Sequence, residues 1–260
     1  ALRIWAYVGK NTSAITTFES LVGKPMNIVS VFHAFIDDFP LYYSDAVGAK
    51  GKTLLVFWEP FTGYDSIIDG SQDIAIKKFA TDANTYGYPV ILAPFPEMNG
   101  NWDVWDGTIG NNTPAKFITA WRHIHDLFYG VKNVKFAIAF NSNSVPDILG
   151  NQISDYYPGD SYVDYVGVDG FNFNNPWVSF DDIFSTVLTK LATYHKPIYI
   201  LSMGSVPGVE KATWIKDALS VQLKKYSISG WVWFNQDGAD GNWLVNSDPA
   251  SLSAFKQVIQ

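Results

Sequence analysis

One carboxylic acid set among aromatic residues is the feature of this sequence best suited to chemistry. Glu97 follows an apolar run that Pro94 and Pro96 interrupt, and Trp102 and Trp105 come within eight residues after it. Proline cannot donate to a sheet ladder, so we expect a strand to end just before the acid. A carboxylic acid can protonate the leaving oxygen of a glycosidic bond, and indole faces pack against sugar rings. The stretch therefore predicts a carbohydrate site on a loop held by a strand, rather than a surface loop with a buried aromatic anchor.

Apolar runs typical of buried parallel strands alternate along the chain with amphipathic runs typical of helices. The expected strands cover residues 2–8, 26–32, 53–58, 90–95, 134–140, 163–169, 198–201 and 228–234. The expected helices cover residues 12–22, 39–47, 71–86, 113–128, 179–194, 209–221 and 248–259, and the connection after the fifth strand is irregular. Eight such units over about 250 residues predict an α/β fold of the (β/α)8 TIM-barrel type, with residues 1–260 as a single domain.

The alternative fold is an open, doubly wound parallel sheet. That fold usually has a glycine-rich phosphate loop after its first strand. Here the first strand is followed by Val8-Gly9-Lys10-Asn11, which is a poor match to such a loop. The alternation therefore favours the barrel.

The composition argues against several classes of function. The net charge is −7 and no run of Lys or Arg is present, so we expect no nucleic-acid partner. No apolar stretch approaches the roughly 18 residues of a membrane span. The sequence has no Cys, which excludes disulfides and thiolate metal sites, and Ala1 leads directly into an expected strand, as in a mature or trimmed chain. The ten Trp residues suit a carbohydrate cleft.

The chemistry of a TIM barrel lies at the carboxyl ends of its strands. In this chain, amides, carboxyls and aromatic side chains follow the expected strands, which suits an uncharged, polyhydroxylated ligand. The candidate substrate-binding residues at these exits are Trp58, Glu59, Asn99, Trp102, Trp105, Asn141, Asp169, Phe171, Trp231 and Trp233. His123 and His125 are two residues apart on an expected helix and cannot share a ligand face, so we predict no metal and no cofactor.

The run Glu97-Met98-Asn99-Gly100, with the two Trp residues that follow it, resembles the general-acid motif of glycoside hydrolase family 26. That family comprises β-mannanases with some β-1,3-1,4-glucanases and β-1,3-xylanases. The likeness extends over essentially the whole chain, through residues 18–25, 167–170 and 231–233. It implies a (β/α)8 barrel that hydrolyses with retention, with Glu97 as the general acid/base and a nucleophilic Glu at the seventh strand exit.

Three positions depart from the family pattern. Pro96 stands where relatives commonly have His, and Phe171 where many have Tyr. The third departure bears on the mechanism, because the family's nucleophilic Glu would fall on Ser202. A Ser hydroxyl has a pKa far above neutrality and no base is evident beside it, so it cannot replace a carboxylate. The chain is then either a nucleophile-disabled variant, of the glycosynthase or substrate-trapping kind, or a natural binding protein on an inactive barrel; the intact surroundings of Glu97 favour the first.

The resemblance implies a secreted, monomeric endo-β-glycanase that acts on a polysaccharide, most simply β-1,4-mannan. A β-1,3-1,4-glucanase on the same scaffold is the alternative enzyme, because no motif distinguishes the two sugars. A carbohydrate-binding barrel without hydrolytic activity is the alternative from another class. We expect the chain with Ser202 to lack hydrolytic activity in any of these cases.

Overall fold

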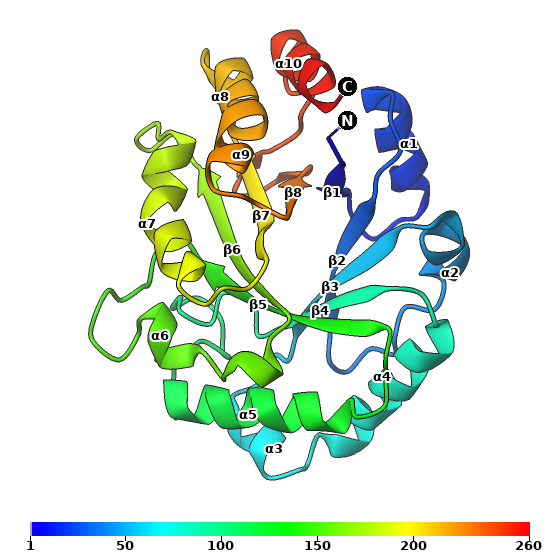
Figure 1. The fold of residues 1–260 in the computed structure, drawn as a ribbon, viewed down its shortest axis with the longest axis vertical. Helices are drawn as coiled ribbons and strands as arrows, with labels where there is room; N and C mark the ends of the chain where they lie inside the picture. Colours follow the sequence, from blue (N-terminus) through cyan, green and yellow to red (C-terminus); the bar gives the residue numbers. More distant parts are fainter. Residues whose placement is uncertain (1) are drawn as a thin grey trace.

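The structure, a computed structural model, describes residues 2–260. Within them, eight parallel strands pair in chain order, and the last strand pairs with the first to close a barrel (Figure 1). The strands are β1 (Trp5–Tyr7), β2 (Ile28–Ala34), β3 (Thr53–Glu59), β4 (Val90–Pro94), β5 (Val134–Asn141), β6 (Tyr165–Asn172), β7 (Ile198–Ser205) and β8 (Gly230–Phe234). The predicted (β/α)8 fold is confirmed.

Helices surround the barrel, and α1 and α10 lie side by side where the ring closes (Figure 1). The α-helices are α1 (Ser13–Val22), α2 (Tyr43–Ala46), α3 (Asp65–Ile68), α4 (Asp73–Tyr86), α5 (Pro114–Leu127), α6 (Ile153–Tyr156), α7 (Phe180–Ala192), α8 (Lys211–Asp217), α9 (Leu223–Lys225) and α10 (Pro249–Ile259). Short 3-10 turns occupy η1 (Gly48–Lys50) and η2 (Asp160–Tyr162), and η3 (Ala218–Gln222) is a π-helical turn.

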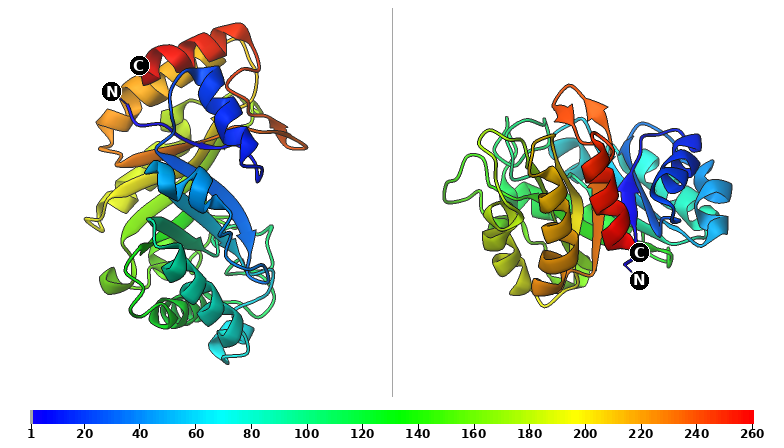
Figure 2. Two further views of the ribbon diagram at one scale, coloured as in Figure 1. Left: turned by 90° about the vertical axis from the view of Figure 1, so that its right-hand side faces the viewer. Right: turned by 90° about the horizontal axis from the view of Figure 1, so that it is seen from above.

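The loops contain elements that the hydrophobic pattern did not predict. The expected helix over residues 39–47 is reduced to the single turn α2, while α3 and α6 are short helices within loops. After β8, the strands β9 (Asp237–Gly238) and β10 (Gly241–Asn242) form a hairpin that projects from the barrel in both views of Figure 2. Within residues 2–260, no helix is both long and apolar enough to cross a membrane.

The predicted helix signals of α5 are confirmed in detail. The Thr113 hydroxyl caps the helix by accepting a hydrogen bond from the Lys116 backbone N–H at 3.1 Å. Proline at the first helical position costs no hydrogen bond, because that N–H has no partner in the helix. Phe117, Trp121 and Ile124 are buried on the inner face, as their spacing predicts. Their packing holds α5 against the barrel.

Side chains of the barrel strands alternate between the interior and the surrounding helices. Tyr7, Phe57, Ala93 and Val232 belong to the cluster inside the barrel. Near the strand ends, Tyr7 stacks on Phe234 with ring centroids 5.0 Å apart. A second stacked pair, Phe32 and Phe57 at 4.7 Å, lies beside it. These rings form a layer across the barrel interior, and Phe32 and Phe234 also line the cavity above it, at the carboxyl ends of the strands.

Three of the tryptophans predicted to bind sugar lie instead on the helix side of the sheet. Trp58 is fully buried and stacks between Phe35 and Phe79, with ring centroids at 3.8 and 4.3 Å. Trp231 and Trp233 are buried against α10. Because successive residues of a strand point to opposite faces, neighbours of inward residues must point outward. The predicted sugar-binding role of these three residues is therefore corrected to core packing.

Replacement of Trp58 by Ala should lower the free energy of unfolding by about 3–5 kcal/mol, as expected for a large buried side chain. Trp58→Phe keeps part of the stacking and should cost less. The measurement is guanidinium unfolding followed by circular dichroism. Trp102→Ala is the matched control, since that indole is 49% exposed and its loss should change stability by less than about 1 kcal/mol. Equal decreases in the free energy of unfolding for Trp58→Ala and Trp102→Ala would contradict the assignment of Trp58 to the core.

Candidate active site

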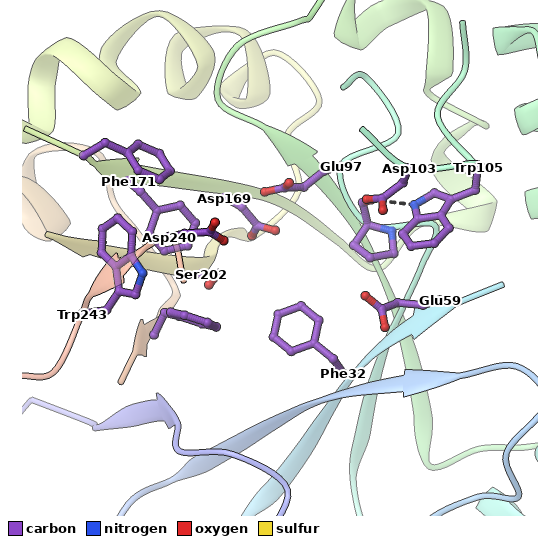
Figure 3. A pocket seen from close by; sticks show the side chains of 13 residues that line it. Phe32, Glu59, Glu97, Asp103, Trp105, Asp169, Phe171, Ser202, Asp240 and Trp243 are labelled. Carbon is purple, nitrogen blue, oxygen red and sulfur yellow. Dashed lines mark hydrogen bonds between the residues drawn. The ribbon is translucent and has the colours of Figure 1, made fainter. Parts of the chain in front are cut away.

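A cavity of about 190 Å³ opens at the carboxyl ends of the strands (Figure 3). Acidic side chains lie across it and aromatic rings form its walls. The lining residues are Phe32, Glu59, Pro96, Glu97, Asp103, Trp105, Asp169, Phe171, Phe173, Ser202, Phe234, Asp240 and Trp243. The cavity therefore contains both the carboxyl expected at the fourth strand exit and the hydroxyl expected at the seventh.

The backbone around Glu97 is held in an unusual conformation. Both Phe95 and Glu97 have positive φ, at 53° and 61°. Residues other than Gly adopt this region at a cost of roughly 1–2 kcal/mol each. The Glu97 N–H donates to the Ala139 carbonyl at 2.8 Å, and the Trp105 indole N–H donates to the Pro96 carbonyl at 2.9 Å. These bonds fix the direction of the Glu97 side chain into the cavity.

Asn141 of β5 holds the Glu97 carboxyl and is itself held by Asn99, which follows β4. The side-chain oxygen of Asn99 accepts from the Asn141 backbone N–H at 2.8 Å, and its amide donates to the Asn141 carbonyl at 3.1 Å. The Asn141 amide in turn donates to Glu97 Oε1 at 3.3 Å. Asn99 is fully buried behind the cavity wall. It therefore positions Asn141 and does not itself contact a ligand, which corrects its predicted role in substrate binding.

A β-bulge in β7 places Ser202 in the cavity. The pairing of β6 with β7 shifts between Val168 and Asp169, so that Val168 faces Ile200 and Asp169 faces Ser202. Leu201 is the extra residue, and its side chain packs inside the barrel. A bulge re-aims the side chain that follows it. Without the shift, strict alternation would turn Ser202 toward the helices.

Gly167 makes room for this bulge. A Cβ at Gly167 would lie 2.3 Å from Leu201 Cδ1, far inside contact distance. A larger residue on β6 would therefore displace Leu201, and with it the following Ser202. This close approach accounts for the glycine in the Gly167-Val168-Asp169-Gly170 run.

The half-buried Glu97 and the buried Asp169 form a carboxyl pair. Burial raises the pKa of Glu97, and the Asp103 charge adds to this, while hydrogen bonds from Asn141, Asp169 and Trp102 oppose it. Burial, followed by the charge of Glu97, raises the pKa of Asp169 well above its usual range. Two carboxylates in contact cannot both ionise, so one proton is held between them. Asp169 is only 3% exposed, and we infer that it keeps the proton at neutral pH and donates it to Glu97.

Further carboxyls with raised pKa lie on the β3 and β4 side of the cavity. Burial and the nearby Asp103 raise the pKa of Glu59 to about 7, against a small opposing effect of Lys10. Burial also raises the pKa of Asp103. Asp106, behind the cavity wall, is buried and has its pKa raised to about 7 mainly by that burial. Titrating groups gathered in one cleft are typical of a functional site.

Some of the predicted site residues lie at the cavity, and the others, Asn99 and the three tryptophans described above, do not. Glu59, Glu97, Trp105, Asp169, Phe171 and Ser202 line the cavity, Asn141 reaches it through Glu97, and Trp102 is half exposed beside Glu97. The sequence reasoning missed Phe32, Asp103, Phe173, Phe234, Asp240 and Trp243. Strand alternation could have found Phe32 and Phe234, which share the inward face of their strands. The other four lie on loops, for which no periodicity gives a signal.

The donor set of the cavity does not suggest a metal. Among residues 2–260, no group of three or more His, Cys, Asp or Glu side chains has the geometry to hold a metal ion. The carboxyls that line the cavity are spread around its wall (Figure 3). They are placed to act on a ligand separately or in pairs.

The fold and the site together define a (β/α)8 barrel with a carboxyl held at the fourth strand exit inside an aromatic cleft. Residues 59–248 match the model of glycosyl hydrolase family 26, and the chain belongs to that family. The resemblance seen in the sequence is thereby confirmed at the level of the family.

The relatives of this chain include glucanases and mannanases. Endoglucanase H of Acetivibrio thermocellus is 36% identical over 99% of this chain, which spans 30% of that protein's length. A mannan endo-1,4-beta-mannosidase of Bacillus subtilis is 28% identical over 53% of this chain and 34% of its own length. Among solved structures, a β-mannanase from a symbiotic protist of the termite Reticulitermes speratus, complexed with gluco-manno-oligosaccharide, has a TM-score of 0.69. It is 15% identical, with 99% of this chain and 87% of that chain covered, and it shows the shared fold.

The raised pKa of Asp106 should make the protein less stable as the pH rises. Its folded pKa of about 7 lies above the usual 3.8, so the folded state binds the proton more tightly than the unfolded state does. Stability is then full below about pH 4 and declines until about pH 7. Asp106 Oδ2 accepts from the Trp102 and Asp103 N–H groups at 2.8 and 2.9 Å, and an Asn oxygen can accept the same bonds.

Asp106→Asn should therefore gain stability relative to the parent as the pH rises from about 4 to 8. The measurement is urea unfolding at several pH values. Asp45→Asn, at an exposed carboxyl on α2, is the control and should show no such gain. A constant difference between Asp106→Asn and the parent would contradict the buried-proton assignment.

Proposed function

We propose that this chain is the β-glycan-binding and catalytic barrel of an endo-acting, retaining glycoside hydrolase, with Ser202 in the place of the nucleophile. The observation that carries the proposal is Glu97, partly buried in an aromatic cleft, with its carboxyl held by Asn141 and its pKa raised. Burial raises the pKa of Glu97, which is the direction that a general acid needs. As it stands, the chain binds polysaccharide and does not hydrolyse it.

Ser202 cannot supply the missing chemistry. Retention needs two carboxyls roughly 5–5.5 Å apart, one to protonate the leaving oxygen and one to attack the sugar. Asp169 is in hydrogen-bond contact with Glu97, which is too close for that arrangement. Asp169 also keeps its proton, so it is no base for the Ser202 hydroxyl. Among the described residues that line the cavity there is no His to take that role.

The substrate that we favour is a β-glucan. The similarity to Endoglucanase H covers 99% of this chain, whereas that to the Bacillus subtilis mannosidase covers 53%. This reverses the preference for mannan that the acid motif alone suggested. Mannan stays the second candidate, because mannanases share the fold and match part of the chain. The two sugars differ by one hydroxyl orientation at C2, so the cleft must distinguish a single hydrogen bond.

The Ser202→Glu variant should hydrolyse polysaccharide at least about 10³-fold faster than the parent, the size expected for a catalytic group. The restored carboxylate attacks the anomeric carbon while Glu97 protonates the departing oxygen, and Glu97 then deprotonates the water that frees the sugar. Reducing ends released from mixed-linkage β-glucan and from mannan measure the rate and rank the two substrates. Ser202→Gln has the size of Glu without its charge and should stay inactive. A parent that already hydrolyses as fast as Ser202→Glu would place the nucleophile elsewhere, with Glu59 and Asp169 next to test.

The parent should also join sugars from an α-glycosyl fluoride. The C1–F bond breaks, the acceptor hydroxyl oxygen forms the new C1–O bond, and its proton passes to the Glu97 carboxylate. The Ser202 hydroxyl donates a hydrogen bond to the departing fluoride. Fluoride release and lengthened products measure the reaction. Glu97→Gln should abolish transfer, and Ser202→Ala should slow it; transfer that persists unchanged in Glu97→Gln would remove Glu97 from the mechanism.

A further inference from the structure

Two phenylalanines are exposed beside the cavity, each against a tryptophan that lines it. Phe61 is 61% exposed, and its ring meets Trp105 edge-to-face, with centroids 5.4 Å apart. Phe173 is 55% exposed and meets Trp243 in the same way at 5.1 Å. Single exposed apolar side chains are ordinary. Here each of the two exposed rings packs on a tryptophan that lines the cavity, and Phe173 also lines the cavity itself.

The two aromatic pairs lie on opposite sides of the reacting groups. In Figure 3, Trp105 and Trp243 stand at the two ends of the cavity, with Glu97, Asp169 and Ser202 between them. Phe61 follows β3 and is packed on the first indole, and Phe173 follows β6 and is packed on the second. The two exposed rings are therefore attached to tryptophans at opposite ends of the cavity.

The backbone holds both rings in place. Phe61 has a φ of 51°, in the left-handed region that bulky residues avoid. Three residues further on, the Tyr64 N–H donates to Asn112 Oδ1 at 3.1 Å and anchors that loop. The loop that carries Phe173 is anchored by the buried Asn172, whose Oδ1 accepts from the Val178 N–H at 3.0 Å. Aromatic surfaces that are fixed before binding lose little conformational entropy when a ligand packs on them.

Each end of the cavity also offers a carboxyl to hydroxyl groups. Asp103 lies toward Trp105 and Asp240 toward Trp243 (Figure 3). A β-linked chain of gluco- or manno-configured sugars presents C–H groups on the faces of its rings and hydroxyls along their edges. Aromatic rings match the faces, and carboxylates accept from the hydroxyls. The alternation of the two kinds of group along the cleft fits an extended sugar chain.

We propose that Phe61 and Phe173 are stacking platforms for sugar rings on either side of the reacting bond, so that affinity for a sugar chain rises with its length beyond a disaccharide. The inference rests on the proposed function and adds to it the length of the ligand. The catalytic groups act at the centre of the cleft, and the two platforms hold the chain at both ends.

Calorimetry of the parent with β-gluco- and β-manno-oligosaccharides of two to six rings tests the inference. Affinity should rise with length. Phe61→Ala and Phe173→Ala should each weaken binding of the hexasaccharide roughly tenfold, a typical aromatic packing contribution, and change disaccharide binding less than about twofold. Phe61→Trp and Phe173→Trp should keep the affinity. Tyr129→Ala is the matched control, since that ring is 97% exposed on a loop at the other end of the barrel, and it should change nothing.

The double variant with both Phe61→Ala and Phe173→Ala tests whether the two rings are separate platforms or parts of a single one. If the rings lie at opposite ends, the effects of Phe61→Ala and Phe173→Ala on hexasaccharide binding should add in free energy. Affinity that does not depend on length, or equal losses for disaccharide and hexasaccharide, would overturn the inference while leaving the proposed function intact. If no oligosaccharide binds at millimolar concentration, it is the proposed function that fails.

Discussion

The pairing of Asn99 with the backbone of Asn141 is the interaction on which the chemistry of this protein depends. It ties the loop after β4 to the end of β5 through two hydrogen bonds. The side-chain amide of Asn141, held in this way, donates a hydrogen bond to the Glu97 carboxyl. Glu97 can keep its unfavourable backbone conformation only because its N–H is also held by the neighbouring strand. Strain at a reacting residue persists where the surrounding structure enforces it in this way.

The residue at position 202 affects which of Glu97 and Asp169 carries the shared proton. A Glu there would bring a negative charge to the wall that Asp169 and Glu97 share, and the repulsion would raise the pKa of Glu97 further. With Ser202, that charge is missing, and the proton between Glu97 and Asp169 rests with the more deeply buried partner. Glu97 is then better suited to accept a proton than to donate one. Under the proposed function, Ser202 would thus favour bond formation from an activated donor over hydrolysis of a polymer.

Much of the fold could be predicted from the sequence, because buried parallel strands are apolar on both faces and leave a strong signal. An uninterrupted apolar run does not show which of its side chains point into the barrel. For that reason Trp58, Trp231 and Trp233 were assigned to the cleft although they pack against helices. The bulge that re-aims Ser202 left no signal in the composition. The exit of the seventh expected strand pointed to the position, and only its role came from the family likeness. Asp240 and Trp243 belong to the hairpin region after β8. Their place in the cavity depends on a loop path that hydrophobic periodicity does not describe.

A crystal structure of the parent soaked with a β-glucan hexasaccharide tests the central claim most directly. The claim predicts an intact chain across the cavity, with one glycosidic oxygen within hydrogen-bond reach of the Glu97 carboxyl. The anomeric carbon of the same bond should face the Ser202 hydroxyl, with sugar rings over Phe61 and Phe173. A hexasaccharide cleaved by the parent, or bound away from Glu97 and Ser202, would contradict the account.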